Sequence, residues 1–492
     1  MMSFFLILLT LLGPAASAAP SALAAATLAS SAPRQHRDSL ELSLPHAVER
    51  AIRIGDESRA AAAQVDVTDA QVTIARSAGL PQLRFNGSQS HVIESARAAA
   101  VGSIFNQPNT YTANATLSQT LFQGGKIAAG SRAASDLRNA ARLDQTEVAS
   151  QVSLDVQRAY LQVLFAATFA EIQDTSVALA QQRYLQTVQF EKAGRASRYD
   201  VLRANVERAN LQPTAIQAHS DVELALVELR RLINLPADQP LKLTSRLDSS
   251  SVLAWVTRLR ADDGTMNRAA VRSAELVAEA RNAGVATARA DLFPTISISG
   301  LVGGQAFPLS GFPTSRGRFD TIPCADGSTT KVCTRQNGGW FGDKSFGVQV
   351  GLPIFDGLRA RGAIELAAAQ ARLAYIQLAQ TRERVESEAA AARAGLDRAE
   401  ALFAARGQNA SEATEAYRLA SLRQSRGLAT QLEVSDAQLA LTVARTNEAR
   451  AVYDLYLAAA GYARALGRPP QAFDLPYTTT HTAIPLPVKR VP

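Results

Sequence analysis

The sequence has few of the residues that build metal centres. It contains 492 residues, of which 5 are histidine and 2 are cysteine. The histidines are far apart in the chain and lack the spacing of zinc ligands: His36, His46, His91, His219 and His481. We therefore expect no metal site and no bound cofactor.

A disulfide framework is excluded for the same reason, because only one close pair of cysteines exists. Cys324 and Cys333 lie in a segment rich in Gly, Thr and Asp. Low cysteine usage with one such pair is typical of an oxidising compartment, where the pair would form a loop disulfide that stabilises by about 2–3 kcal/mol. Two free thiols are the alternative, and a metal site would need more ligands than this segment offers.

Motifs of the common enzyme classes are absent as well. The sequence has no Gly-x-Ser-x-Gly, no P-loop and no Gly-x-Gly-x-x-Gly between a strand and a helix. Its net charge is +7, from 51 Lys and Arg against 44 Asp and Glu, but the two signs are interspersed. This distribution favours a solvated helical surface over a nucleic-acid-binding groove. We expect no catalytic residues and no nucleic-acid partner.

The N-terminus has the features of a secretory signal peptide. An apolar core runs from Phe4 to Leu12, Gly13 and Pro14 break it, and small residues at 16–18 suit cleavage. The core is too short to span a bilayer, and no cysteine follows that could carry a lipid. The sequence thus predicts a signal peptide over 1–19, export without a lipid anchor, and a flexible segment rich in Ala, Ser and Pro over 20–39.

The rest of the chain is an internal duplication. Ala193–Asn205, in which one helical run ends and another begins, returns at Arg426–Gln438, so that Gly427 follows Gly194 by 427 − 194 = 233 positions. The same offset joins further pairs: Phe122 with Phe355, Gly124 with Gly357, Tyr184 with Tyr417, and Pro236 with Pro469. A fixed repeat of this length predicts two similar structural units.

We expect the first repeat over 40–236 and the second over 267–469, with a linker or equatorial segment over 237–266 and a C-terminal tail over 470–492. Each repeat should contain a helix, a β-hairpin and a long helical hairpin. The helix tips are predicted near residue 194 and near residue 427.

The β-hairpins, over 82–122 and 295–355, are recognised by an apolar period of two. Leu83 and Phe85 alternate with Arg84 and Asn86, for example. Strands of about ten residues with one apolar face are typical of a transmembrane barrel. A soluble two-layer sheet would show the same alternation, but no other apolar segment is large enough to cover that face.

Four strands from one chain cannot close a barrel, and lipid does not tolerate an open sheet edge. Several chains must therefore contribute strands, and three chains would supply twelve. The second hairpin is the longer one. Its outer loop carries aromatic residues that either lie near the membrane interface or pack within the loop itself: Phe307, Phe312, Phe319, Trp340 and Phe341.

Each hairpin is followed by a bend and a long helix. The bends are Leu121–Gly124 and Ile354–Gly357, in which Phe122 and Phe355 precede glycines that permit a sharp change of direction. The run from Lys126 to Gly194 predicts a nearly unbroken helix of about 100 Å. The helix after Gly194 should return to about Leu235, with a kink at Pro213.

Taken in this order, these features resemble the TolC-type outer membrane efflux proteins, the outer membrane factors of tripartite efflux and type I secretion systems. The resemblance covers roughly residues 40 to 470 and rests on the duplication, the bends and the two tips. It implies a mainly α-helical protein with a membrane β part: a homotrimer with a twelve-stranded barrel in the outer membrane lipid of a Gram-negative bacterium and a periplasmic α-barrel tunnel. It also implies passive conduction, with a periplasmic adaptor and an inner-membrane transporter of the RND, ABC or MFS type as partners.

The resemblance also suggests where a gate lies. Glu433 and Asp436 match acids that form rings at the periplasmic end of the tunnel in this family, and Asp200 matches an acid that ties neighbouring helix pairs. Threefold symmetry would bring like carboxylates together, which raises their pKa values and attracts cations. Ordinary solvated charges at a helix end are the alternative.

The partners of that first-half acid are not retained. Where the family has an arginine and a tyrosine bonded to it, this chain has Ala429 and Gln424, and Arg198 and Arg426 are the nearby candidates for a substitute. The turns at Gly194, Gly427 and Leu428 resemble the family's adaptor-docking surface.

Two other interpretations explain the sequence less well. A periplasmic adaptor would have one helical hairpin flanked by lipoyl-like β segments, whereas this chain has two helical hairpins and two strand pairs. A structural coiled-coil protein of the envelope would leave the strands unexplained. The sequence does not indicate whether drugs, metal ions or proteins would be the transported substrate.

Overall fold

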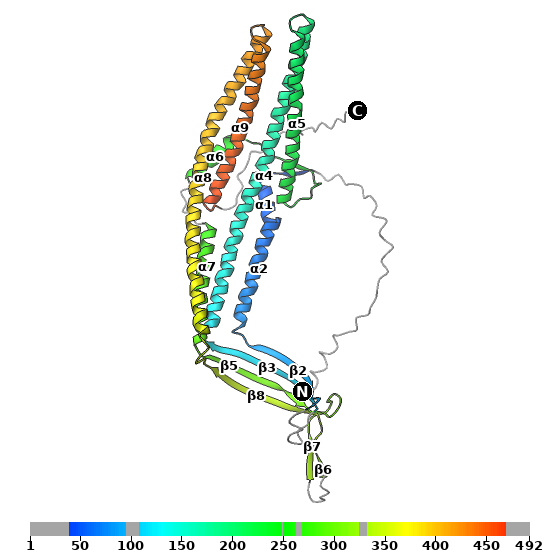
Figure 1. Ribbon diagram of the computed structural model, residues 1–492, viewed down its shortest axis with the longest axis vertical. Helices are drawn as coiled ribbons and strands as arrows, with labels where there is room; N and C mark the ends of the chain where they lie inside the picture. Colours follow the sequence, from blue (N-terminus) through cyan, green and yellow to red (C-terminus); the bar gives the residue numbers. More distant parts are fainter. Residues whose placement is uncertain (1–38, 95–107, 248, 262–267, 324–331, 469–492) are drawn as a thin grey trace, which may run out of the picture.

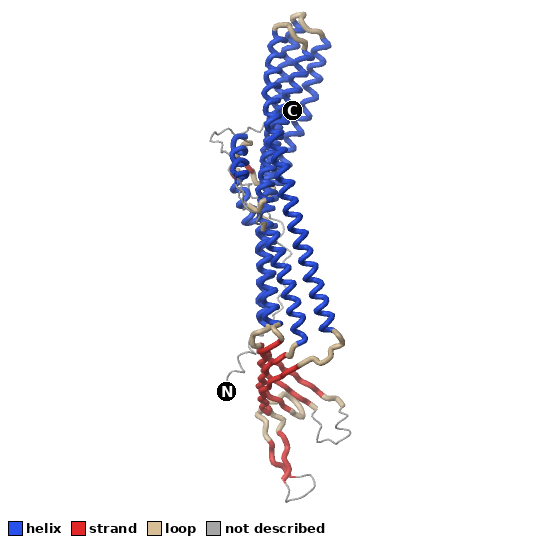
Figure 2. Tube along the Cα trace, turned by 90° about the vertical axis from the view of Figure 1, so that its left-hand side faces the viewer, coloured by secondary structure: helices blue, strands red, loops and turns tan. Residues whose placement is uncertain are grey.

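The computed structural model describes residues 39–94, 108–247, 249–261, 268–323 and 332–468. The predicted signal peptide over 1–19, the flexible segment over 20–39 except Ser39, and the tail over 470–492 lie outside these residues. Long helices stand on a single β-sheet, with both helical tips at the end of the molecule opposite the strands (Figures 1 and 2).

Both halves contain a long helical hairpin of the same size. In the first half it consists of α4 (Lys126–Lys192) and α5 (Arg198–Leu232), and in the second of α8 (Arg359–Ser425) and α9 (Gln431–Ala465). The long helices α4 and α8 have 67 residues each, and α5 and α9 have 35 each. Every boundary of the second hairpin lies 233 positions after its counterpart, as in 359 − 126 = 233. The helix boundaries of the two halves therefore differ by the same 233 positions as the repeated residues in the sequence.

The helix predicted at the start of the first repeat is interrupted. It forms α1 (Leu44–Ile54) and α2 (Asp56–Ser77), which are separated by Gly55. Gly55 has extended backbone angles, and a Cβ atom there would lie 2.4 Å from the carbonyl oxygen of Ala51. Only glycine therefore fits this close approach between the two helices. Pro213 lies inside the continuous helix α5.

The segment between the halves has more structure than a linker. It contains β4 (Leu241–Leu243), which pairs in parallel with β1 (Leu40–Leu42), and α6 (Ser249–Ala261). The second half then continues with α7 (Ala269–Arg289) and the short helix η2 (Ala290–Leu292). The short elements β4 and α6 lie beside the long helices at mid-height, whereas α7 lies between mid-height and the sheet (Figures 1 and 2).

The four long strands form one antiparallel sheet in the order β2-β3-β5-β8. Its strands are β2 (Gln82–His91), β3 (Asn109–Gln123), β5 (Thr295–Ala306) and β8 (Trp340–Gly351). Pairing of β3 with β5 joins the two predicted hairpins into a single sheet. The outer loop of the second hairpin forms a further pair, β6 (Phe319–Pro323) with β7 (Val332–Gln336).

Bulky apolar side chains are concentrated at mid-height, where α1, α4, α6 and α9 meet. Leu44, Tyr160, Leu161 and Tyr456 are fully buried there. The Tyr160 hydroxyl donates to the Leu42 carbonyl at 2.9 Å. The one polar atom of this buried side chain therefore has a hydrogen-bond partner. Among the described helices, α4 has an 18-residue window apolar enough to cross a membrane, with a mean hydropathy of 1.2. We attribute this to the core, to which α4 contributes Val152–Leu164.

The order in which the long helices pack decides which of them are interior. Nearer the sheet, α4 packs between α2 and α7, and α7 packs against α8. Nearer the tips, α4 packs against α5 and α9, and α9 packs against α8. Helix α4 is therefore interior along its whole length, whereas α2, α5 and α8 lie at the edges of the chain.

Candidate functional site

The two tips are built by the same left-handed turn. Gly194 has φ +72° and Gly427 has φ +76°, in the region that side chains other than glycine rarely adopt. The amide of Gly194 donates to the Glu191 carbonyl at 2.9 Å, and that of Gly427 donates to Gln424 at 2.9 Å. These bonds satisfy the last carbonyls of α4 and α8. Leu428, which follows the second glycine, is 66% exposed.

Each returning helix starts with a capping box. Ser197 accepts from the amide of Asp200 at 3.2 Å, and Asp200 accepts from the amide of Ser197 at 2.9 Å. In the second half, Thr430 and Glu433 make the same reciprocal bonds, at 3.3 Å and 3.1 Å. Asp200 and Glu433 are thus equivalent positions, 233 residues apart. Their carboxylates satisfy amides that have no partner within the helix.

These caps lower the pKa values of both acids. The side-chain hydrogen bond from Ser197, followed by the backbone one, lowers the pKa of Asp200 below its usual value. The backbone hydrogen bond from Thr430, followed by the side-chain one, lowers the pKa of Glu433. Within one chain, therefore, the environment favours the ionised form. The mutual repulsion expected from the sequence would act between copies of the chain and stays a prediction.

The remaining residues predicted for the gate lie around these caps. Asp436 is exposed one turn after Glu433. Arg198 forms an ion pair of 3.7 Å with Glu191, whereas Asp200 accepts a hydrogen bond from the Ser197 hydroxyl. Arg423, which the sequence analysis overlooked, lies 3.7 Å from Glu433 and donates to the Leu428 carbonyl at 3.2 Å.

The capping boxes were also overlooked, although Ser-x-x-Asp and Thr-x-x-Glu are visible as soon as the helix starts are placed. Their presence gives Asp200 and Glu433 a structural role in one chain that does not depend on any gate. Asp436 has no such role in the described structure, which makes it the more specific candidate for a gate residue.

At the opposite end, the sheet has two chemically different faces. Cross-strand partners share a face, so the register places Leu83 with Leu117, and Ile298 with Val348. The apolar face continues through these residues: Phe85, Ala115, Ile296, Val302, Phe346 and Val350. Leu83, Phe346 and Val348 are 73%, 76% and 61% exposed. Among the described residues, no element covers this face except at its outer end.

The other face of the sheet is lined by small and polar side chains. Asn86 donates to Asn114 at 3.4 Å, and the hydroxyls of Ser88 and Thr112 are 2.6 Å apart. The alternation therefore separates an apolar surface from a polar one, as the sequence predicted. The alternation does not continue to Leu121. The register shifts between Thr120 and Phe122, so that Phe122 takes the apolar position beside Ile296.

Aromatic side chains lie at both ends of the apolar face. At the outer end, the ring of Phe312 is 5.4 Å from Tyr111 and 6.4 Å from Trp340, whose indole donates to the Pro313 carbonyl at 2.9 Å. At the end nearer the helices, Phe122, Phe293 and Phe355 are exposed. Part of the outer loop is thus folded against the apolar face. Phe319 lies farther out, 5.6 Å from Phe341, which is on the polar face.

The bends between strands and helices differ in how tightly they are packed. Gly124 and Gly357 both have positive φ, +55° and +68°. A Cβ atom at Gly124 would lie 2.7 Å from the Ala290 carbonyl, whereas the space beside Gly357 is open. The first bend is also held by an ion pair of 2.7 Å between Lys126 and Asp291.

The predicted disulfide is not tested by the structure. Cys324 lies outside the described residues, and Cys333 lies in β7, where its backbone pairs with Ile322.

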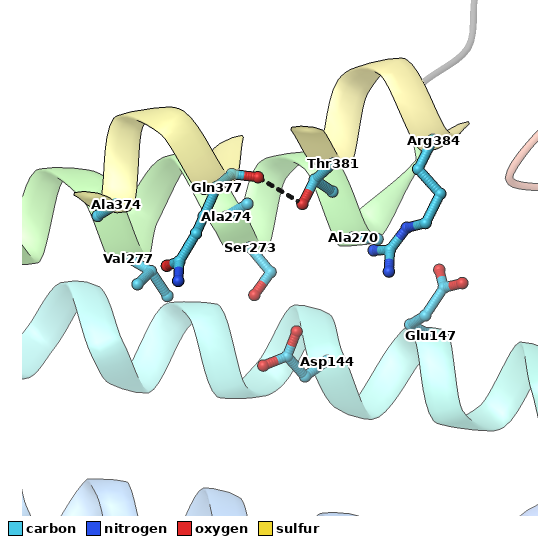
Figure 3. A pocket seen from close by; sticks show the side chains of 10 residues that line it. All are labelled: Asp144, Glu147, Ala270, Ser273, Ala274, Val277, Ala374, Gln377, Thr381 and Arg384. Atoms are coloured by element: carbon cyan, nitrogen blue, oxygen red, sulfur yellow. Dashed lines mark hydrogen bonds between the residues drawn. The ribbon is translucent and has the colours of Figure 1, made fainter. Parts of the chain in front are cut away.

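A cleft of about 390 Å³ lies between α4, α7 and α8. Asp144 and Glu147 point into it from α4, and Arg384 points toward Glu147 (Figure 3). The Thr381 hydroxyl, which lines it, donates to the carbonyl of Gln377 at 2.8 Å. Among the described residues, no group of three His, Cys, Asp or Glu side chains could hold a metal ion.

A buried charge cluster adjoins this cleft and has a structural explanation. Arg268, 5% exposed, lies 2.6 Å from Glu147 and also bonds Glu388. Arg464 reaches the same Glu147 at 3.2 Å. The cluster joins α4, α8, α9 and the residue before α7, and its charges are paired with one another. It therefore fixes helices rather than a ligand.

Comparison with known proteins agrees with this geometry. The family model of the outer membrane efflux proteins matches residues 57–235 and 264–468, one segment in each half. The chain is 24% identical over 395 residues to nodulation protein T of Rhizobium leguminosarum bv. viciae, which covers 80% of this chain and 75% of that protein.

Solved structures share the fold. The CmeC outer membrane channel of Campylobacter jejuni superposes with a TM-score of 0.69 at 17% identity, over 86% of this chain and 85% of that one. The outer membrane protein VceC of Vibrio cholerae gives a TM-score of 0.66 at 20% identity, over 87% of this chain and 97% of that one.

The long helical hairpins and the two-faced sheet are therefore those of an outer membrane efflux channel. The chain belongs to the outer membrane efflux protein family, whose model covers most of its length. Among the structures that share its fold, CmeC and OprN are outer membrane channels.

Proposed function

We propose that three copies of this chain form one exit duct through which substrates pass passively from the periplasm to the exterior. The observation that carries the proposal is the pair of free sheet edges. In the order β2-β3-β5-β8, the strands β2 and β8 each have one neighbour. Because the membrane does not tolerate an open edge, β8 of one copy should pair with β2 of the next. Three copies would then close a barrel of twelve strands.

The helical layer supports the same arrangement. Below mid-height its edges are α2 and α8, and both expose apolar side chains at helical spacing. Val67 and Ile74 on α2 are 49% and 69% exposed. Leu366, Leu373 and Ile376 on α8 are exposed to a similar extent. Contact between α8 of one copy and α2 of the next would close the helical tunnel at the same subunit boundary at which β8 and β2 close the barrel.

The apolar face sets the position in the membrane. From Ile296 to Ala306 the strand rises about 33 Å, which at the usual tilt of such strands corresponds to a band of about 25 Å. Aromatic side chains at both ends of the band are typical of membrane interfaces. The helices, about 100 Å long, would then reach across the periplasm. Export by the predicted signal peptide over 1–19, without lipid attachment, would deliver the chain there.

The tips are the proposed gate and docking surface. Threefold symmetry would arrange Asp436 and Glu433 as rings of acids around the tunnel axis, and such rings attract cations. Asp200 would lie beside them, on the first helical hairpin. The exposed turns at Gly194, Gly427 and Leu428 would receive a periplasmic adaptor and, through it, an inner-membrane transporter of the RND, ABC or MFS type. The family description, outer membrane efflux protein, is consistent with these partners.

The native mass and the membrane location of the mature protein test this proposal directly. After detergent extraction we expect an outer-membrane species of three times the chain mass, where one full chain has 52.3 kDa. It should form cation-selective pores in planar bilayers. A monomer in the periplasmic fraction would contradict the proposal, because four strands cannot close a barrel alone.

A further inference from the structure

Arg183 is a buried charge close to the tips. It lies on α4, about 14 Å before the end of the helix, and 5% of its side chain is exposed. A buried guanidinium is costly unless it is paired and hydrogen-bonded. Its partners should therefore indicate what this position does.

The partners of Arg183 come from both helical hairpins. Its Nη1 donates to Glu207 Oε1 on α5 at 2.8 Å and to Ser435 Oγ on α9 at 2.8 Å. Ser435 Oγ in turn donates to Glu207 Oε2 at 3.0 Å. One arginine thus connects three helices, and the triad of Arg183, Glu207 and Ser435 joins the first hairpin to the second.

The contact between α4 and α9 is polar for two further turns. The hydroxyls of Ser176 and Thr442 are 2.9 Å apart, and Gln438 donates to the Ser176 carbonyl at 3.1 Å. Ser176 and Gln438 are each 4% exposed. Because both hydrogen bonds are buried or partly buried and form only in one alignment of the helices, they fix α9 against α4.

The duplication shows what the corresponding contact between subunits contains. In a ring of three copies, α8 of one subunit would lie against α5 of the next, just as α4 lies against α9 within a subunit. With the offset of 233, Arg183 corresponds to Ala416, Glu207 to Ala440, and Ser435 to Leu202. Ala416, Ala440 and Leu202 are all exposed in the single chain. The contact between subunits therefore lacks the ionic triad.

We propose that Arg183 is a positioning residue of the gate, which locks the two hairpins of one subunit together so that the tips separate only between subunits. Ser435 directly precedes Asp436, so that Arg183 fixes the part of α9 that carries the proposed acidic ring. This inference rests on the proposed trimeric channel. It assigns opening to the three contacts between subunits, which lack the triad, and keeps the three contacts within subunits closed.

Matched disulfides test which contact moves. With Cys324→Ser and Cys333→Ser as background, Ser176→Cys with Thr442→Cys links α4 to α9 within a subunit. The equivalent pair, Asn409→Cys with Ala209→Cys, links α8 to α5 of the next subunit. We expect the first disulfide to leave single-channel opening unchanged and the second to abolish it until reductant is added. Loss of opening with the first disulfide, or an intact trimer in which the second does not form, would overturn the inference.

Charge removal tests Arg183 itself, with Arg208 as the matched control. Arg208 lies at the same height but bonds only within the first hairpin, to Gln181 and Asn205, both at 2.9 Å. We expect Arg183→Met to raise the open fraction by about tenfold or more, since hydrogen bonds to charged groups stabilise by at least that factor. Cation selectivity should fall with it, because Asp436 is no longer held.

Arg208→Met should leave both quantities unchanged, and Arg183→Lys should restore part of the closed state. Equal effects of Arg183→Met and Arg208→Met would contradict a positioning role. An unaltered protein that forms no trimer or no pore would instead contradict the proposed function. The two failures are therefore distinguishable.

Discussion

The two helical hairpins have identical lengths but different surroundings. Leu161 is fully buried in α4, whereas the equivalent position in α8 is Ala394. Leu164 of α4 corresponds to Asp397. Helix α4 has neighbours on both sides, while α8 lies at an edge. Since the two helices share their length and their bends, the neighbours account for the divergence of their side chains.

The comparison shows which side chains a duplicated helix carries at an interior position and at an edge position. An interior helix can bury large apolar residues and even an arginine, because several helices supply partners. An edge helix has mostly alanines at its buried positions and exposes Leu366, Leu373 and Ile376. An exposed apolar stripe of this kind marks a surface that another chain covers.

The largest expected effect comes from the exposed edge. Leu373→Asp would bury a charge between subunits, so we expect the trimer to be lost while the helix content of the chain is kept. Native mass and circular dichroism measure the two quantities. Leu373→Met is the matched control and should remain trimeric, since it keeps the apolar surface. A trimeric Leu373→Asp protein would mean that α8 is not at a subunit contact.

The interior helix should respond in stability rather than in assembly. Leu161→Ala gives α4 the side chain that α8 has at the equivalent position. It should lower the free energy of unfolding by about 2–5 kcal/mol through lost burial and a residual cavity. Leu253→Ala, at a 41% exposed position on α6, should change it by less than about 0.5 kcal/mol. Similar losses for both variants in denaturant titrations would contradict the assigned core.

At the tips, the comparison is between the charge of the acidic side chains and their role in capping the helix. Glu433→Gln with Asp436→Asn removes two carboxylates per chain, while Gln can still accept the capping bonds. We expect cation selectivity and block by divalent or trivalent cations to weaken several-fold in single-channel recordings. Asp436→Asn alone should give most of the change, since Asp436 does not cap the helix. Unchanged selectivity and block in both variants would remove these acids from the gate.

Patterns that can be read along the sequence predicted most of this architecture. The alternation of Leu83 and Phe85 with polar residues indicated the strands, and the offset between Gly194 and Gly427 indicated the two helical hairpins. Neither signal depends on which elements pack together in space. The division of the first helix at Gly55 was missed, because only the close approach of the Ala51 carbonyl requires glycine there.

The triad of Arg183, Glu207 and Ser435 could not be predicted in the same way. Its members lie on three helices and are separated by up to 252 positions. Nothing in the local pattern distinguishes a buried arginine from the many solvated ones. Arg423 beside Glu433 was missed for the same reason, whereas the capping boxes were visible in the sequence and were simply not used.

The smallest expected effect concerns the two caps themselves. Ser197→Ala removes the side-chain cap of α5 and should cost about 1 kcal/mol locally, seen as faster hydrogen exchange over residues 198–203. The same residues should lose protection in acid. The pKa values of Asp200 and Glu433 are lowered from the usual 3.8 and 4.5 in the folded protein. Their stabilisation is therefore present above those values and is lost as the pH falls through the lower folded values.

The second tip gives the internal comparison. Thr430→Ala should act on residues 431–436 alone, and the Ser197→Ala variant should leave them protected, because the two caps share no hydrogen bond. Exchange that rises at both tips in either single variant would show that the tips unfold together. The triad of Arg183, Glu207 and Ser435 would then transmit unfolding from one cap to the other. Among the described residues, it is the charged contact between α4 and α9 that lies nearest to the tips.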